Sequence, residues 1–251
     1  MEIRRKREFY SVILLILIYL LFVSIPFSMF INNETVVYIL NISMRVLFIP
    51  FFFIYVKKEN LLSLNKPEFK LVDFKYIPFL LLTVSNLIVS LISKFDMYEI
   101  SSTEIIKNLI LSVFIAFNEE LVFRVVVCKE LIVTQSRFKT MLYSSIVFGL
   151  IHLLNINSLG SIPYVLLQVV YSFGLGLLLS LIYIQSYNFV YIFMLHFLFD
   201  FLNGFLISDL YVLEYNLVFF IVNISIGVII GLYALLLYLK EEKNVTKAMD
   251  I

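Results

Sequence analysis

The chain has 251 residues, of which 62% are hydrophobic and 15% are charged, and its formal net charge is +1. A soluble domain of ordinary composition carries about 25% charged residues, so these values exclude one and indicate an integral membrane protein. The net charge gives no sign of a nucleic-acid partner, and Cys128 as the single cysteine excludes an intrachain disulfide.

Apolar runs of about 20 residues, long enough to cross a bilayer as helices, follow one another along the chain. The first run follows the basic residues 4–7; it is too long for a signal peptide and lacks a cleavage site of small residues, so we expect a retained span. About eight spans are predicted, near residues 9–31, 36–56, 76–93, 108–128, 140–156, 164–184, 189–207 and 217–239. The runs are too continuously apolar for barrel strands, so the predicted fold class is all-α, a polytopic membrane protein in a single domain 1–251.

The basic residues predict how these spans are oriented. Of the 19 Lys and Arg residues, 15 fall in segments that eight spans would place on one side, and only Lys94 and Lys107 fall on the other. Positive residues are enriched in cytoplasmic loops, so a multi-pass cell-membrane protein with both termini in the cytoplasm is predicted. No internal repeat is visible, and Gly174 and Gly176 are expected to permit close helix contact.

Six ionisable side chains in the second half of the chain fall inside predicted spans, where each costs at least about 2.5–3.5 kcal/mol. They are Glu119, Glu120, Arg124, His152, His196 and Asp200. Helical spacing stacks Glu120 on Arg124, four residues on, and predicts an ion pair between them, whereas Glu119 points about 100° away.

Depth along the helices predicts that four of these groups share one layer. At about 1.5 Å per residue, Glu119 lies roughly 13 Å and His152 roughly 18 Å from the cytoplasmic end of its span. On the same scale, His196 lies roughly 10 Å and Asp200 roughly 16 Å deep. The layer would therefore open toward the cytoplasm, with the polar site buried between helices.

Two kinds of function fit such a layer. A carboxylate and an imidazole facing one cavity can activate water, and a second imidazole with a short polar side chain can stabilise an oxyanion. A buried polar network can instead hold helices together through hydrogen bonds. The residues alone favour a functional site over a purely structural network. They do not decide whether that site is hydrolytic or handles protons.

Three short motifs resemble those of the CPBP intramembrane proteases, also called the Abi or CAAX-protease family, which read EExxxR, FxxxH and HxxxN or HxxxD. Here they read EELVFR at Glu119 to Arg124, FGLIH at Phe148 to His152 and HFLFD at His196 to Asp200. The resemblance covers residues 108–205, which would carry the protease core, while the segment before residue 107 matches only in being apolar.

The resemblance implies a function and a role for each residue. Members hydrolyse peptide bonds in or next to the membrane; the eukaryotic ones act on prenylated CAAX proteins, and the bacterial ones are linked to processing of peptides or membrane proteins and to bacteriocin immunity. Carried over, Glu119 and His152 would activate water, while His196 and Asp200 would stabilise the oxyanion. Glu120 and Arg124 would support the architecture. The expected partners are a peptide or membrane-protein substrate and the lipid bilayer, with the oligomeric state open.

Two competing functions are a catalytically silent immunity or scaffold protein and a proton-coupled transporter, although a transporter predicts an internal repeat. No cofactor is certain: a divalent metal such as zinc is possible from two His and several carboxylates, yet the chain has no HExxH motif. Asp200 departs from the Asn of eukaryotic members, and an ionised Asp only accepts hydrogen bonds. Arg45, roughly 15 Å deep in its span, is expected to pair with Asp200, to bind a substrate's terminal carboxylate or to reach water.

Overall fold

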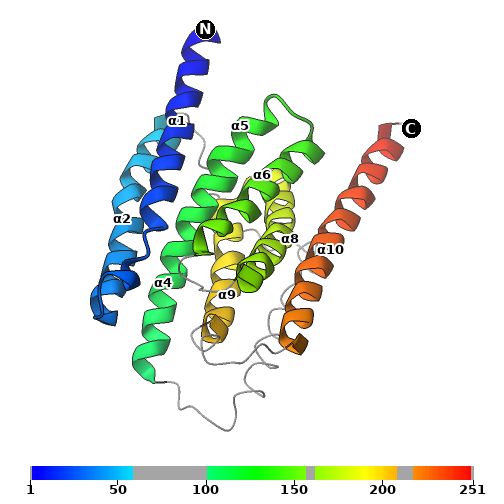
Figure 1. Cartoon of the computed structure of the whole chain (residues 1–251). Helices are drawn as coiled ribbons and strands as arrows, with labels where there is room; N and C mark the ends of the chain where they lie inside the picture. The colour runs from blue at the N-terminus through cyan, green and yellow to red at the C-terminus, as the bar shows by residue number, and fades with distance from the viewer. Residues whose placement is uncertain (1, 59–100, 157–161, 208–216, 250–251) are drawn as a thin grey trace.

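A computed structural model of the chain describes residues 2–58, 101–156, 162–207 and 217–249, and in these segments every regular element is helical (Figure 1). The α-helices are α1 (Glu2–Val23), α2 (Glu34–Lys58), α4 (Ser102–Glu120), α5 (Lys129–Ile132), α6 (Arg137–Ile151), α8 (Ile162–Ser186), α9 (Phe189–Ile207) and α10 (Leu217–Met249). Two 3₁₀ turns, η1 (Phe27–Met29) and η4 (His152–Asn155), and a π-helical segment, η3 (Leu121–Cys128), complete the elements. The predicted all-α class is confirmed for these residues.

Several described helices are suited to a bilayer. Those long and apolar enough to cross it are Glu34–Lys57, Ile162–Ser186 and Ile224–Lys243. Two shorter apolar helices, Ile13–Met29 and Phe189–Leu202, accompany them. The chain is therefore a membrane protein, as predicted. The count of eight spans stays a prediction, because the span expected at 76–93 lies outside the described residues.

The span predicted at 108–128 starts earlier than expected and is not one regular helix. Ser101 caps α4 by accepting the Glu104 backbone N–H at 3.2 Å, while the Glu104 carboxylate accepts the Ser101 N–H at 3.1 Å. At Leu121 the helix widens into the π-helical η3, a feature frequent at functional sites. Ser144 of α6 donates its hydroxyl to the Phe123 carbonyl within η3, at 3.0 Å, and so ties α6 to this segment.

The span predicted at 140–156 also changes its helix type. Ser136 caps the start of α6 by accepting the Lys139 backbone N–H at 3.3 Å, and α6 ends at Ile151. His152 is the first residue of the tighter 3₁₀ turn η4. Because a 3₁₀ helix has three residues per turn, side chains from His152 onward leave the face that a continued α-helix would give them.

Helix α8 lies between α6 and α10 in the middle of the molecule (Figure 1). Its two glycines face these two neighbours: a Cβ added at Gly174 would lie 2.1 Å from the Gly227 carbonyl oxygen of α10, and one added at Gly176 would lie 3.2 Å from Ser145 Cβ of α6. The close helix contact predicted for this pair of glycines is therefore confirmed on both sides of α8.

Helices α1 and α2 pack together beside α4, on the side away from α10 (Figure 1). The Tyr19 ring of α1 makes edge-on contacts with the Phe48 and Phe52 rings of α2, each at 5.4 Å between centroids. On its other side, α4 packs along α9. This arrangement leaves a space between the α1–α2 pair and the remaining helices, and the candidate site lies there.

Candidate active site

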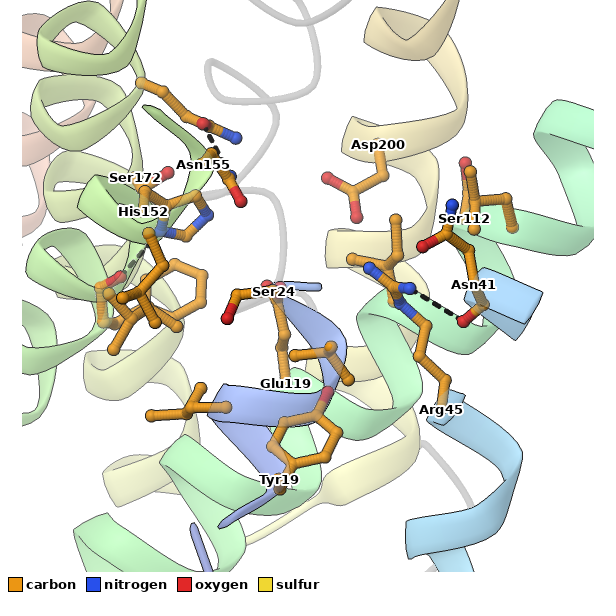
Figure 2. A pocket seen from close by; sticks show the side chains of 18 of the residues that line it. Tyr19, Ser24, Asn41, Arg45, Ser112, Glu119, His152, Asn155, Ser172 and Asp200 are labelled. Carbon is orange, nitrogen blue, oxygen red and sulfur yellow. Dashed lines mark hydrogen bonds between the residues drawn. The ribbon is translucent and has the colours of Figure 1, made fainter. Parts of the chain in front are cut away.

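A cavity of ≈ 460 Å³ lies between α1, η1 and α2 on one side and α4, α6, η4, α8 and α9 on the other (Figure 2). Its volume is within the range of roughly 300–1,000 Å³ that small-ligand pockets occupy. Four of the six ionisable residues predicted from the sequence line it: Glu119, His152, His196 and Asp200. The other two, Glu120 and Arg124, are fully buried behind the cavity wall.

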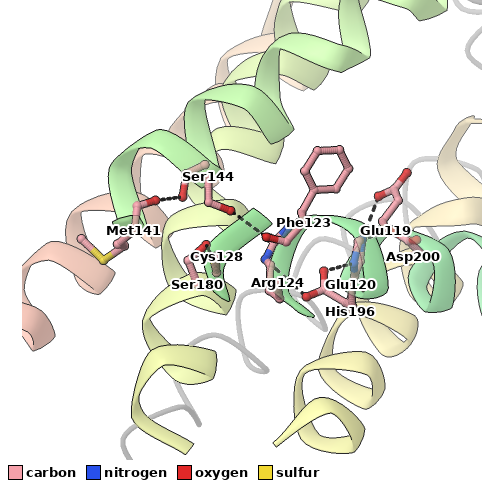
Figure 3. A network of polar contacts seen from close by, with 11 residues as sticks. Glu119, Glu120, Phe123, Arg124, Cys128, Met141, Ser144, Ser180, His196 and Asp200 are labelled. Atoms are coloured by element: carbon pink, nitrogen blue, oxygen red, sulfur yellow. Dashed lines mark hydrogen bonds and ion pairs between the residues drawn. The ribbon is translucent and has the colours of Figure 1, made fainter. Parts of the chain in front are cut away.

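The buried pair forms the base of a polar network (Figure 3). Arg124 Nε lies 3.3 Å from Glu120 Oε2, with both side chains at 0% exposure, so the ion pair expected from their spacing is present. The other carboxylate oxygen of Glu120 lies 2.7 Å from His196 Nδ1 on α9. Glu120 therefore joins η3 to α9 through an ion pair to Arg124 and a charge-assisted hydrogen bond to His196.

The Arg124 guanidinium also contacts an aromatic ring. Its Cζ lies 4.3 Å from the centroid of the Phe148 ring of α6. Among the described residues, its Nε, Nη1 and Nη2 have no hydrogen-bond partner, although Nε lies at ion-pair distance from Glu120. The ring face therefore offsets part of the cost of burying these donors, since a desolvated cation over an aromatic ring gains about 2 kcal/mol.

His196 has its two ring nitrogens in different surroundings. A carboxylate oxygen accepts hydrogen bonds, so the Nδ1–H donates to Glu120 and holds the ring in place. The other nitrogen, Nε2, lies 3.7 Å from Glu119 Oε2 and 3.4 Å from Asp200 Oδ1. Glu119 and Asp200 are 18% and 22% exposed at the cavity, so Nε2 is shared between two carboxylates that a ligand can reach.

His152 lies across the cavity from Asp200 (Figure 2). Its Nδ1 is 2.9 Å from the Phe148 carbonyl oxygen one turn earlier. Because a carbonyl only accepts, Nδ1 carries the proton, and Nε2 of the neutral ring keeps its lone pair. His152 can therefore accept a proton or orient a water molecule within the cavity.

The motif spacing correctly grouped the polar residues but missed one contact. The four cavity residues come together as a layer, and the Glu120–Arg124 pair lies beside them. The bond between Glu120 and His196 was not foreseen, because the two residues are 76 positions apart and nothing in either motif marks the contact.

Several uncharged polar residues of the cavity wall were also missed. They include Tyr19, Ser24, Asn41, Asn155, Gln168 and Ser172. Asn155 of η4 donates from Nδ2 to Gln168 Oε1 on α8 at 2.9 Å. The four-residue spacing of Gln168 and Ser172 within an apolar helix is the signal that could have marked one polar face of α8.

Arg45 enters the cavity from α2 (Figure 2). Its Nη1 donates to the Asn41 backbone carbonyl at 2.9 Å, one turn earlier in the same helix. Both Arg45 and Asp200 belong to the described residues, and no ion pair joins them, so the expected alternative of an Arg45–Asp200 pair is not what the structure contains.

The His, Cys, Asp and Glu side chains of the site can be compared with the ligands that a divalent metal ion needs. In the part of the chain that the structure describes, no three His, Cys, Asp or Glu side chains are arranged to hold a metal ion. A catalytic zinc requires three protein ligands in tetrahedral geometry, so this arrangement does not support a metalloprotease.

A known protein family matches the segment of the chain that carries the site. Residues 101–202 match the model of a family described as type II CAAX prenyl endopeptidase, Rce1-like. The matched segment contains all six ionisable residues of the three motifs, whereas α1, η1 and α2 lie outside it. The chain matches no curated protein and no solved structure significantly.

Proposed function

We propose that this membrane protein is an intramembrane endopeptidase that uses Glu119 and His152 to activate water. The match of residues 101–202 to the Rce1-like CAAX endopeptidase family, which the three motifs also resemble, supports the proposal. It hydrolyses a peptide bond of a peptide or membrane-protein substrate in or next to the membrane. One observation carries the proposal: four ionisable side chains from α4, η4 and α9 line a single cavity large enough for a short peptide segment.

In the proposed reaction, Glu119 takes a proton from a water molecule that the Nε2 lone pair of His152 orients. The water oxygen adds to the carbonyl carbon of the scissile bond. Glu119 then gives its proton to the leaving nitrogen as the C–N bond breaks, which regenerates the carboxylate and releases a carboxylic acid and an amine. The exposure of Glu119 to the cavity supports this role, because the water and the substrate can reach it.

The developing oxyanion is assigned to His196. Its Nδ1 is fixed by Glu120, so the Nε2–H of the protonated ring has one direction in which to donate. Asp200, with Oδ1 at 3.4 Å from Nε2, favours the proton at that nitrogen. Glu120 and Arg124 act through His196 and are positioning residues, whereas Glu119, His152, His196 and Asp200 contact the reacting atoms.

We propose a reaction without a metal. The carboxylate and imidazole named above supply the base, and His196 supplies the electrophilic N–H, so each step has a protein group to perform it. Prolonged dialysis against a chelator such as 1,10-phenanthroline should leave the rate of cleavage unchanged. A loss that added zinc restores would contradict this part of the proposal.

The family name suggests a prenylated peptide as the first substrate to test. In a bacterial cell, the same activity would serve the processing of peptides or membrane proteins, or bacteriocin self-immunity. The protein would lie in the cell membrane with both termini cytoplasmic. Cysteines introduced at residues 129–139 should then be shielded from an impermeant thiol reagent in intact cells, and labelling from outside would overturn the orientation.

The decisive experiment uses the purified full chain in lipid vesicles with a quenched fluorescent peptide that carries a farnesylated cysteine near its C-terminus. The wild type should cleave it, and Glu119→Gln should lower the rate at least 100-fold. The matched control is Glu34→Gln, the same change at an exposed position outside the cavity, which should keep the wild-type rate. A Glu119→Gln variant with near-normal activity would show that water activation is assigned to the wrong residue.

The main alternative is a non-catalytic immunity or scaffold protein, which the complete burial of Glu120 and Arg124 also supports, since such a network joins helices with or without catalysis. The membrane peptidomes of cells with wild type and Glu119→Gln distinguish the two. If the peptidomes are identical and the vesicle assay shows no cleavage by the wild type, the endopeptidase proposal is overturned.

A further inference from the structure

Arg45 is the cavity residue that the three motifs leave without a role. It lies on α2, outside the segment that matches the endopeptidase family, yet it faces the same cavity as Glu119 and Asp200. Among the described residues that line the cavity, it is the only Lys or Arg. A permanently charged guanidinium inside an apolar helix costs several kcal/mol unless it has a partner or a function.

The contacts that the structure gives Arg45 do not satisfy that charge. Among the described residues, its one hydrogen bond runs from Nη1 to the Asn41 carbonyl, which is neutral and uses one of five N–H donors. Within the described residues, no carboxylate lies at ion-pair distance from it. Its half-buried side chain therefore directs donors into a space that a ligand can occupy.

The wall next to Arg45 is polar as well. Asn41 of α2 and Ser112 of α4 line the cavity with it and are labelled close to it in Figure 2. Both are neutral; the Asn41 amide can donate hydrogen bonds, whereas the single hydroxyl hydrogen of Ser112 is donated to Asn108 Oδ1 at 3.3 Å. A cation flanked by neutral polar side chains is suited to a small anion, and a guanidinium matches a carboxylate through two parallel hydrogen bonds.

We propose that Arg45 binds the free C-terminal carboxylate of the substrate, so that the enzyme selects peptides whose chain ends inside the cavity. This proposal rests on the proposed endopeptidase function and adds the residue that recognises the substrate's end. A sphere of the cavity's volume is roughly 10 Å across, and an extended chain advances about 3.3–3.6 Å per residue. A terminus held at Arg45 thus places a bond only a few residues upstream beside Glu119.

The test compares two peptides and four proteins. The peptides are the farnesylated substrate used above, prepared once as the free C-terminal acid and once as the C-terminal amide. The proteins are wild type, Arg45→Gln and Arg45→Lys, with Arg137→Gln as the matched control, because Arg137 is exposed and does not line the cavity. Values of kcat and KM are measured for each pair in vesicles, and the melting temperature of each variant is measured in detergent.

For the wild type, the free acid should have a kcat/KM about 10- to 100-fold higher than the amide, mainly through KM, as expected for a charge-assisted hydrogen bond to an ionised group. Arg45→Gln should remove this preference, so that its kcat/KM values for the acid and the amide become equal. Arg45→Lys should keep part of the preference, because it retains the charge without the paired donors. The Arg137→Gln control should behave as wild type.

Other outcomes overturn the proposal in distinguishable ways. Equal cleavage of acid and amide by the wild type would refute carboxylate recognition while leaving the endopeptidase function intact. A fall in kcat for both peptides in Arg45→Gln would show that Arg45 instead acts on Glu119. If Arg45→Gln fails to fold, the Arg45→Lys variant decides: an acid preference equal to that of wild type would refute the paired contact. No cleavage of either peptide by the wild type would count against the function itself.

Discussion

Glu119 and Glu120 are adjacent residues of the same type, and they belong to two different regions of the protein. Glu119 faces the cavity with 18% of its side chain exposed, whereas Glu120 is completely buried between Arg124 and His196. A rotation of about 100° along the helix separates the two environments. A single step along the helix therefore separates a side chain that a ligand can reach from one that contacts only other protein groups.

The two regions should respond differently to substitution. A residue of the cavity contacts substrate and water, so its loss should appear in the rate and hardly in stability. A residue of the buried network contacts only other protein groups, so its loss should leave an unpaired charge and appear in stability first. The experiments below test whether the two regions differ in this way.

The largest effect is expected for His152→Gln, on the cavity side. Removal of an imidazole that orients water should lower kcat/KM about 10²- to 10⁴-fold, while the melting temperature stays within a few degrees of wild type. Peptide cleavage in vesicles and thermal unfolding in detergent measure the two quantities. A variant that is unstable and fully active would place His152 in the structural region instead.

The next effect is expected for Arg124→Met, within the buried network. Loss of the guanidinium leaves the Glu120 carboxylate with His196 as its remaining partner and should lower the free energy of unfolding by about 3–5 kcal/mol. The double variant Glu120→Gln with Arg124→Met should recover part of this loss, because both charges of the Glu120–Arg124 pair are then removed. Thermal unfolding of both variants checks the prediction, which fails if the single variant is as stable as wild type.

A smaller effect is expected for Gly174→Ala, in the apolar contact between α8 and α10. The added methyl would lie 2.1 Å from a backbone oxygen of α10, so the helices must separate, at a cost of about 1–3 kcal/mol. Gly231→Ala is the control, because its nearest neighbour would be 3.4 Å away, an ordinary contact. Equal melting temperatures for the two variants would contradict the close packing seen at Gly174.

The smallest effect is expected for Asp200→Asn. Asp200 is not paired with Arg45, so the substitution strands no arginine, and Glu120 still holds the His196 ring, so activity should stay within about tenfold of wild type. A neutral Asn no longer favours the proton at His196 Nε2, so the activity of the variant should fall at lower pH than that of the wild type. A pH–rate profile measures this. A stable but inactive variant would show that the carboxylate itself is required.

The polar layer was largely predictable because membrane helices make polar residues conspicuous. An ionisable group in an apolar run is costly, so Glu119 and His152 stood out without knowledge of the fold. The four-residue spacing likewise predicted the pair of Glu120 and Arg124. The close approach at Gly174 followed from the same reasoning, because small residues permit helix contact.

Three features were not predictable from local patterns. The π-helical segment at Leu121 depends on packing against α6 and α9, and helical periodicity does not reveal it. The bond from Glu120 to His196 joins distant parts of the chain, so it requires the tertiary structure. The position of Arg45 in the cavity depends on how α2 packs on α4. Its depth along α2 indicated only that it lies at about the level of the polar layer.

The Phe148 ring has a consequence for motion at the site. It makes edge-on contacts with the imidazoles of His152 and His196, at 5.3 and 5.8 Å between centroids, and the Arg124 guanidinium lies over it. Residues of all three motifs therefore touch a single rigid side chain on α6. If α6 turned about its axis when a substrate entered, both histidines and the guanidinium would have to shift with it. Opening of the cavity is accordingly expected to come from α1 and α2, because none of the aromatic and cation contacts that the structure gives this ring involves a described residue of these helices.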